Sequence, residues 1–199
     1  ARGALARRVH PLFATRGPPG THDVARGVAL LDALRAGAPV TLPRFDKAAD
    51  APAPPAAWVR VDEPVDLVVF EGWCVGARPE AEAALARPVN ALEAREDPDG
   101  RWRRHVNAEL GGAYRALFAR VHRLVFLQAP AWDVVAGWRL EQERALAAAA
   151  GGGPGVMDEA GVRRFVQHFE RVSRHMLADV PPRADLVVRL DARRRPRPL

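Results

Sequence analysis

Residues 14–24 (ATRGPPGTHDV) combine glycines, prolines, an arginine and a His-Asp pair just before a helical pattern, and such a segment could bind an anion. The loop that most often does so is the P-loop, GxxxxGK[ST], whose backbone amides surround phosphates that its lysine also reaches. Here Gly17 and Gly20 are too close together, no lysine follows, and no apolar strand precedes them. The segment is therefore not a P-loop, and its local pattern indicates a Pro-Gly turn that leads into a helix.

Lys47, in LPRFDKAAD, is the only lysine in the chain. It follows Asp46 and not a glycine, so no P-loop lies elsewhere in these 199 residues. A lysine acts as a compact point charge toward phosphate or carboxylate. Anion binding is therefore one interpretation of Lys47, and a solvated surface lysine is the other.

Glu71, in LVVFEGW, stands at the end of an apolar run that resembles a buried strand. Phosphoryl-transfer sites often place a magnesium-associated carboxylate at such a position. An apolar strand followed by an acid is also a common pattern, and the alternative is a strand-end acid that is exposed to solvent or caps the next turn. The motif alone leaves both interpretations open.

Other reactive residues give weaker signals. Arg139 and Glu143 are four residues apart on a helical pattern and predict a surface ion pair. His168 and His175 follow a face rich in apolar residues, and a histidine metal site would need further ligands at a suitable spacing. There is no GxSxG motif, and no histidine stands near Cys74 in the sequence, so hydrolase chemistry has no support.

The elements that must position these residues alternate between strands and helices. Three apolar runs rich in β-branched residues predict strands at 65–72, 121–130 and 183–191. Helical patterns cover 23–35, with Asp23 as N-cap and Gly37 as stop, and also 102–118, 132–149 and 158–177. This order predicts an α/β fold with a parallel sheet, in which ligands bind beyond the carboxyl ends of the strands.

The length and composition fit one globular domain. A chain of 199 residues, 48% of them hydrophobic, can bury one ordinary core, so we expect a single domain over 1–199. A Pro/Ala stretch and a Gly-rich stretch predict flexible segments near 49–57 and 150–155.

The net charge of +6 comes almost entirely from arginines that alternate with acidic residues. Without a basic stripe interleaved with aromatic residues, we expect small anionic partners and no nucleic acid. No apolar run approaches the length of a membrane helix, and the single cysteine fits a reducing compartment, so we expect no membrane partner and a cytoplasmic location.

Seven motifs, taken in chain order, resemble the D-glycerate 3-kinase family, a branch of the P-loop kinases related to uridine kinase, pantothenate kinase and phosphoribulokinase. They are HPLFATRGPPGTHD, LPRFDKAAD, VDLVVFEGWCVGARP, PVNALEAREDPDGRWRRHVN, LVFLQAPAWDVVAGWRLEQE, FVQHFERVSRHML and RADLVVRLD. Together they extend over nearly the whole chain. The order RGxPGTHD, PRFDKAxD, FEGWxxG is far more specific than any one motif.

The resemblance implies transfer of the γ-phosphoryl group of ATP, with Mg²⁺, to a hydroxyl of glycerate. By motif match, Glu71 is the Walker-B-like acid near the magnesium ion, and Arg139 belongs to a lid that closes over the phosphates. The candidates that would hold the anionic acceptor are Arg16, His22, Arg44 and Lys47.

The chain departs from the family in one large respect. In this family a P-loop with its strand and helix precedes the matching region, and an acid-rich strand end then supplies an aspartate as the expected base. Neither is present in the 199 residues. The resemblance thus implies an N-terminally truncated kinase, inactive alone, whose catalytic base lies in the missing part. Two alternatives stay open: a kinase of another small acceptor, such as a pantothenate- or uridine-like one, and a non-catalytic binding or interaction module.

The expected fold is a three-layer, P-loop-kinase-like α/β domain with a parallel sheet that lacks the P-loop strand and helix. In the family that strand lies between the strands that correspond to 66–70 and 124–127. We therefore expect either a gap between these two strands or their direct but imperfect pairing.

Overall fold

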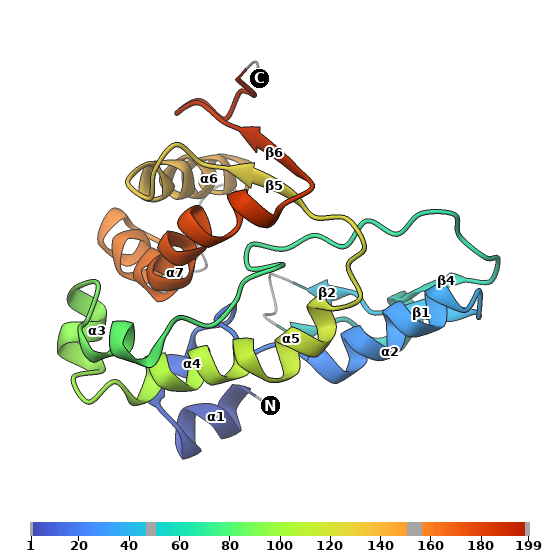
Figure 1. Cartoon of the computed structure of the whole chain (residues 1–199), viewed down its shortest axis with the longest axis horizontal. Helices are drawn as coiled ribbons and strands as arrows, with labels where there is room; N and C mark the ends of the chain where they lie inside the picture. Colours follow the sequence, from blue (N-terminus) through green and yellow to red (C-terminus); the bar gives the residue numbers. More distant parts are fainter. Residues whose placement is uncertain (1, 47–50, 151–156, 198–199) are drawn as a thin grey trace. The chain divides into compact units, whose positions relative to one another are not determined.

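The computed structural model describes residues 2–46, 51–150 and 157–197 (Figure 1). The chain divides into two compact units, one formed by Ala1–His22 with Gly72–Leu199 and the other by Asp23–Glu71. A single domain over 1–199 stays a prediction.

The smaller unit contains one long helix and short antiparallel strand pairs. The helix α2 (Val24–Arg35) confirms the helix predicted over 23–35. The Asp23 side chain caps it, as predicted, by accepting a hydrogen bond from the Arg26 amide at 3.1 Å. Gly37 follows with a φ of 68°, as a helix stop requires. The remaining elements are β1 (Val40–Leu42) paired with β4 (Val59–Val61), β2 (Phe45–Asp46) paired with β3 (Ala51–Pro52), and the short 3₁₀ helix η2 (Pro55–Ala57).

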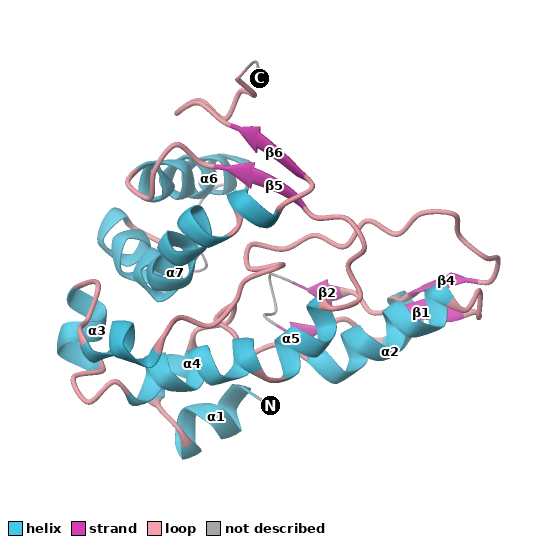
Figure 2. Cartoon of the chain, viewed as in Figure 1, coloured by secondary structure: helices cyan, strands magenta, loops and turns pink. Residues whose placement is uncertain are grey.

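The larger unit is mostly helical, with one pair of strands (Figure 2). Its helices are α1 (Arg2–Arg8), η1 (Pro11–Ala14), η3 (Glu82–Ala86), α3 (Ala91–Glu96), α4 (Arg101–Gly111), α5 (Ala113–Phe118), α6 (Val134–Ala150), α7 (Glu159–Asp179) and η4 (Pro181–Arg183).

The strands β5 (Val125–Gln128) and β6 (Leu186–Arg189) pair in parallel and confirm the strands predicted at 121–130 and 183–191, each in shorter form. The register places Val125 opposite Leu186. The chain runs from β5 through α6 and α7 to β6, which is the helical crossover that parallel strands need.

The strand predicted at 65–72 is wrong. Residues 65–72 belong to no strand, and Leu67 and Val69 are 78% and 81% exposed. A strand exists only where a neighbour completes its hydrogen-bond ladder, and no described strand pairs with this segment. Direct pairing of 66–70 with β5 is therefore not observed, and a gap between them stays a prediction.

The helix predicted at 102–118 is two helices, because Gly112 leaves the helical region with φ −102° and ψ −108°. Glycine adopts such a backbone at low cost, so α4 ends there and α5 begins. The other helices match their patterns closely, and Asp158 caps α7 by accepting from the Gly161 amide at 2.7 Å.

The predicted flexible segments fall partly outside the described residues. Residues 51–52 and 55–57 form β3 and η2, whereas 49–50 and 151–155 are among the residues that the structure leaves undescribed. Flexibility in both segments stays a prediction.

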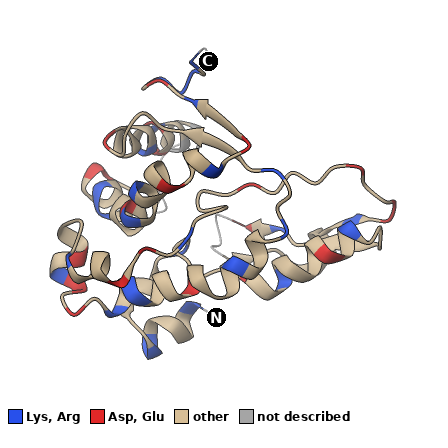
Figure 3. Ribbon diagram, in the orientation of Figure 1, with Lys and Arg blue, Asp and Glu red and all other residues tan. Residues whose placement is uncertain are grey.

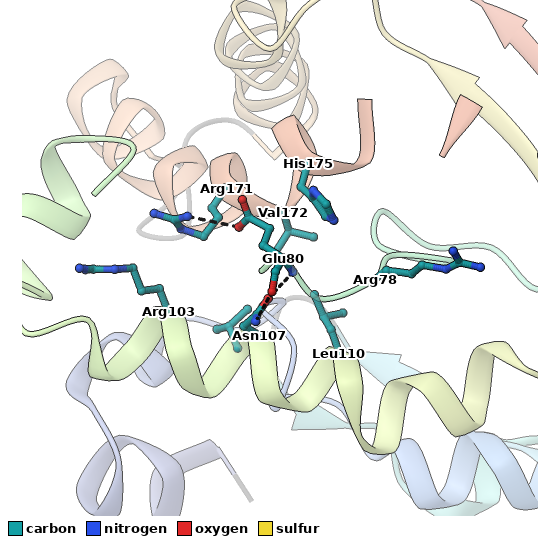
Figure 4. Close-up of a pocket in the computed structure, with 9 residues that line it drawn as sticks. Arg78, Glu80, Arg103, Asn107, Leu110, Arg171, Val172 and His175 are labelled. Atoms are coloured by element: carbon teal, nitrogen blue, oxygen red, sulfur yellow. Dashed lines mark hydrogen bonds and ion pairs between the residues drawn. The ribbon is translucent and has the colours of Figure 1, made fainter. Parts of the chain in front are cut away.

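A buried ion pair in the larger unit fixes α3 against α7. Arg171 is 5% exposed and binds Glu93, which is fully buried, through two hydrogen bonds of 2.8 and 2.7 Å. Arg171 also contacts Glu80 at 3.2 Å, in the close-up of Figure 4. The two carboxylates raise the pKa of Arg171 against the opposing effect of burial, so the guanidinium stays charged inside the core.

Basic and acidic residues are interspersed along the helices (Figure 3). Arg163 and Glu159 pair on the exposed side of α7, for example, and Arg164 of the same helix pairs with Glu96 of α3. Among the described helices, none is both long and apolar enough to cross a membrane.

Candidate functional site

The turn over residues 15–23 depends on a glycine at position 17. Gly17 has a φ of 118°, and a Cβ atom there would lie 2.8 Å from a ring carbon of Phe169. Any other residue would be strained and would also collide with α7. The first glycine of RGPPGTHD thus brings this motif into contact with the motif FVQHFERV.

Thr21 and two prolines make the turn rigid. The Thr21 hydroxyl accepts a hydrogen bond from the Gly17 amide at 2.9 Å and donates one to the Pro18 carbonyl at 2.8 Å. Pro18 and Pro19 are fully buried. Both ends of the turn are therefore fixed, and its side chains are presented from a stable backbone.

Trp73 joins the turn to the motif that contains Glu71. Its indole N–H donates to the Gly17 carbonyl at 3.0 Å, and its ring packs edge-on against Phe169 with 5.0 Å between centroids. No local pattern in the sequence predicts this role of Trp73. The contact joins residues 56 positions apart, so local sequence could not indicate it. It forms because an enclosed indole N–H needs a hydrogen-bond acceptor.

Tyr114 of α5 holds the other end of the turn. Its hydroxyl oxygen accepts a hydrogen bond from the Gly20 amide at 3.0 Å and lies 2.6 Å from Nδ1 of His22. Beside the Gly20 amide, the phenol group can donate its O–H to Nδ1 or accept from Nδ1–H, depending on the tautomer of His22. In the tautomer that accepts from Tyr114, neutral His22 carries its proton on Nε2.

The surroundings of His22 favour this neutral form. Partial burial of the ring and, to a smaller extent, the nearby Arg16 cation lower the pKa of His22 below its usual value. In that tautomer the Nε2–H group is a hydrogen-bond donor, and the Arg16 cation is near enough to act on the ring electrostatically. This pair can receive a carboxylate or a hydroxyl group, and it brings together two of the predicted site residues.

Arg139 lies on α6 in the same unit. Its ion pair with Glu143 was predicted at the surface, but the structure encloses it more than that. Arg139 pairs with Glu143, which is 3% exposed, and its guanidinium stands 5.3 Å from the centre of the Phe165 ring. The second oxygen of Glu143 accepts from the Met157 amide at 3.0 Å. A buried carboxylate with two partners therefore sets the position of Arg139.

The remaining predicted residues belong to the smaller unit. Arg44 is exposed, and its carbonyl accepts from the Ala53 amide at 2.9 Å. Lys47 lies outside the described residues. Glu71 is exposed and makes no hydrogen bond or ion pair with the described residues, so its carboxylate is available to a ligand.

No group of three His, Cys, Asp or Glu residues suited to a metal ion occurs among the described residues. Magnesium bound with a nucleotide needs only one or two carboxylates, because phosphates and water complete its coordination. An accessible carboxylate such as Glu71 fits that requirement.

Comparison with known proteins places these features in context. No protein-family model matches the chain. The chain is 32% identical over 170 residues to the uncharacterized kinase mug58 of Schizosaccharomyces pombe, covering 80% of this chain and 58% of that protein. It is 27% identical over 200 residues to the chloroplastic D-glycerate 3-kinase of Arabidopsis thaliana, covering 93% of this chain and 41% of that protein.

A solved structure shares the fold. D-glycerate 3-kinase from Cryptococcus neoformans superimposes with a TM-score of 0.72 at 24% identity, covering 97% of this chain and 71% of that one. The chain spans about half the length of the two sequence relatives. The chain is thus similar in sequence to a D-glycerate 3-kinase over most of its own length, and it shares the fold of a second one.

Proposed function

We propose that the protein is an ATP-dependent kinase that transfers the γ-phosphoryl group to a hydroxyl of glycerate. The likeness to the D-glycerate 3-kinase of Arabidopsis, over 93% of this chain, supports the substrate. The structural observation that carries the proposal is the rigid turn in which Arg16 stands beside a neutral His22 that Tyr114 orients.

In this proposal the turn binds the acceptor. The guanidinium of Arg16 provides paired donors that match a carboxylate, and Nε2–H of His22 donates to a second oxygen. By motif match, Arg44 and Lys47 are further candidates to bind an anionic acceptor. Binding of this kind fixes the orientation of the hydroxyl, which is most of what a phosphoryl-transfer enzyme must accomplish on the acceptor side.

On the nucleotide side, Glu71 would hold Mg²⁺ directly or through water. Magnesium supplies neutralisation of the charge on the phosphates when it is bound. Arg139 would belong to the lid that excludes water, with Glu143 setting its resting position. The 199 residues contain no GxxxxGK[ST] pattern, and we propose that they do not transfer phosphate by themselves.

A coupled assay of the full gene product with ATP tests this function. We expect ADP formation that depends on D-glycerate and on Mg²⁺, and a KM for glycerate that rises at least tenfold in Arg16→Ala. Arg7→Ala, which removes an arginine from α1, is the matched control and should leave KM unchanged.

The same assay with pantothenate and uridine separates the alternatives. Turnover of either compound without turnover of glycerate would show a kinase of another acceptor. No ATP consumption with any of the three would favour a non-catalytic binding module.

A further inference from the structure

A cavity of about 550 Å³ lies in the larger unit at the amino ends of β5 and β6. Leu124, which precedes β5, and Asp185, which precedes β6, both line it. Other lining residues are Phe118, Arg78, Arg115 and Arg183. The volume falls within the range of pockets that hold a metabolite.

This position separates the cavity from the edge at which parallel sheets bind substrates. Ligands of open α/β sheets lie beyond the carboxyl ends of the strands. Four residues of β5, at about 3.3 Å per residue, place that edge roughly 13 Å away. The cavity is thus at the wrong end of the sheet to serve the phosphoryl transfer proposed above.

Two of the charged groups at the cavity are already neutralised. Arg183 binds Asp179 at 2.8 Å through Nε and donates to the Gly76 carbonyl. Asp185 accepts from Arg123 at 2.8 Å and from the Leu124 amide at 2.7 Å. These contacts lower the pKa of Asp185, so it stays ionised and paired.

Arg78 and Arg115, unlike Arg183 and Asp185, have no charged partner at the cavity among the residues that the structure describes. Both line the cavity, and neither guanidinium has a hydrogen-bond or ion-pair partner among the described residues. Figure 4 shows the Arg78 side chain pointing away from the ion pair between Glu80 and Arg171. The cavity therefore offers two uncompensated positive charges beside an apolar wall that includes Phe118 and Leu124.

We infer that this cavity is a binding site for a small phosphate monoester with an apolar body. A phosphate monoester carries close to two negative charges at neutral pH and matches the two available guanidinium groups. Arginine binds phosphate oxygens through paired donors, and the apolar wall would cover the organic part of the ligand.

Calorimetric titration of the full gene product with phenyl phosphate tests the inference. We expect saturable binding, with weaker binding of inorganic phosphate, which lacks the apolar body, and of phenol, which lacks the charge. Arg78→Ala and Arg115→Ala should each weaken the binding of phenyl phosphate roughly tenfold or more, the loss expected for a charge-assisted hydrogen bond. Arg163→Ala, which removes an exposed arginine from α7, should not change it.

A second variant blocks the space without removing charge. Ala119 is exposed and lines the cavity, so Ala119→Trp should abolish binding with both arginines retained. The inference is overturned if phenyl phosphate does not bind at millimolar concentration or if the arginine variants bind it as tightly as Arg163→Ala. Full affinity in Ala119→Trp, or equal affinity for inorganic phosphate, would overturn it as well.

Discussion

Tyr114 is the residue on which the candidate acceptor site most depends, since one hydroxyl group serves both Gly20 and His22. Tyr114→Phe leaves a backbone donor and a ring nitrogen without their partner. We expect a loss of about 1–2 kcal/mol in the free energy of unfolding, measured with urea. The KM for the acceptor should also rise, because His22 loses its orientation. A variant with unchanged KM would remove Tyr114 from the site.

His168 makes the stability of the fold depend on pH. It is 3% exposed on α7, its Nδ1 lies 3.1 Å from the Phe165 carbonyl, and its ring packs edge-on against Trp102. Burial lowers the pKa of His168, as it does for His22. The unfolded chain then binds protons more readily than the folded one below the usual histidine pKa of about 6.5.

The contribution of His168 to the free energy of unfolding should therefore be constant above about pH 6.5 and fall as the pH decreases toward 5. Urea unfolding at several pH values checks this, and His168→Gln should reduce the slope. The matched variant His122→Gln removes an exposed imidazole and should keep the slope. A slope that is the same in all three proteins would contradict the assignment to His168.

At the scale of the elements, α7 presents one arginine to the core and another to solvent. Arg171→Met leaves Glu93 buried without its cation, which typically costs about 3 kcal/mol or more of the free energy of unfolding. Arg163→Met, on the exposed side of the same helix, should change it by less than about 0.5 kcal/mol. Chemical unfolding of both variants measures the difference, and equal effects would show that the buried pair does not stabilise the packing of α3 against α7.

The elements also show how far the sequence could be interpreted. Helices with their own signals were predicted closely, such as α2 with Asp23 at its start and Gly37 at its end. The strand at 65–72 was wrong because its apolar pattern says nothing about whether a neighbour is present. In the candidate site the turn and its arginine were predictable from local motifs. Tyr114 and Trp73 were not, because they reach the turn from 94 and 56 positions away.

At the scale of the whole molecule, the apolar residues of 65–70 are a liability in solution. Val69 is 81% exposed in a segment that forms no strand and has no partner strand among the described residues. Such segments promote association between chains. Val69→Lys should reduce light scattering of the 199-residue chain at a given concentration, and Thr41→Lys, which adds the same charge at another exposed site, should not. Equal scattering of both variants would contradict this role.

The parallel pairing of β5 with β6 has a kinetic consequence. The contact of Asp185 with the Leu124 amide joins positions 61 residues apart, and the chain between the two strands forms α6 and α7. Closing so long a loop costs entropy that helix formation does not. During refolding, the amides of α6 and α7 should therefore gain protection from hydrogen exchange before those of β6. Simultaneous protection would show that the strands form together with the crossover.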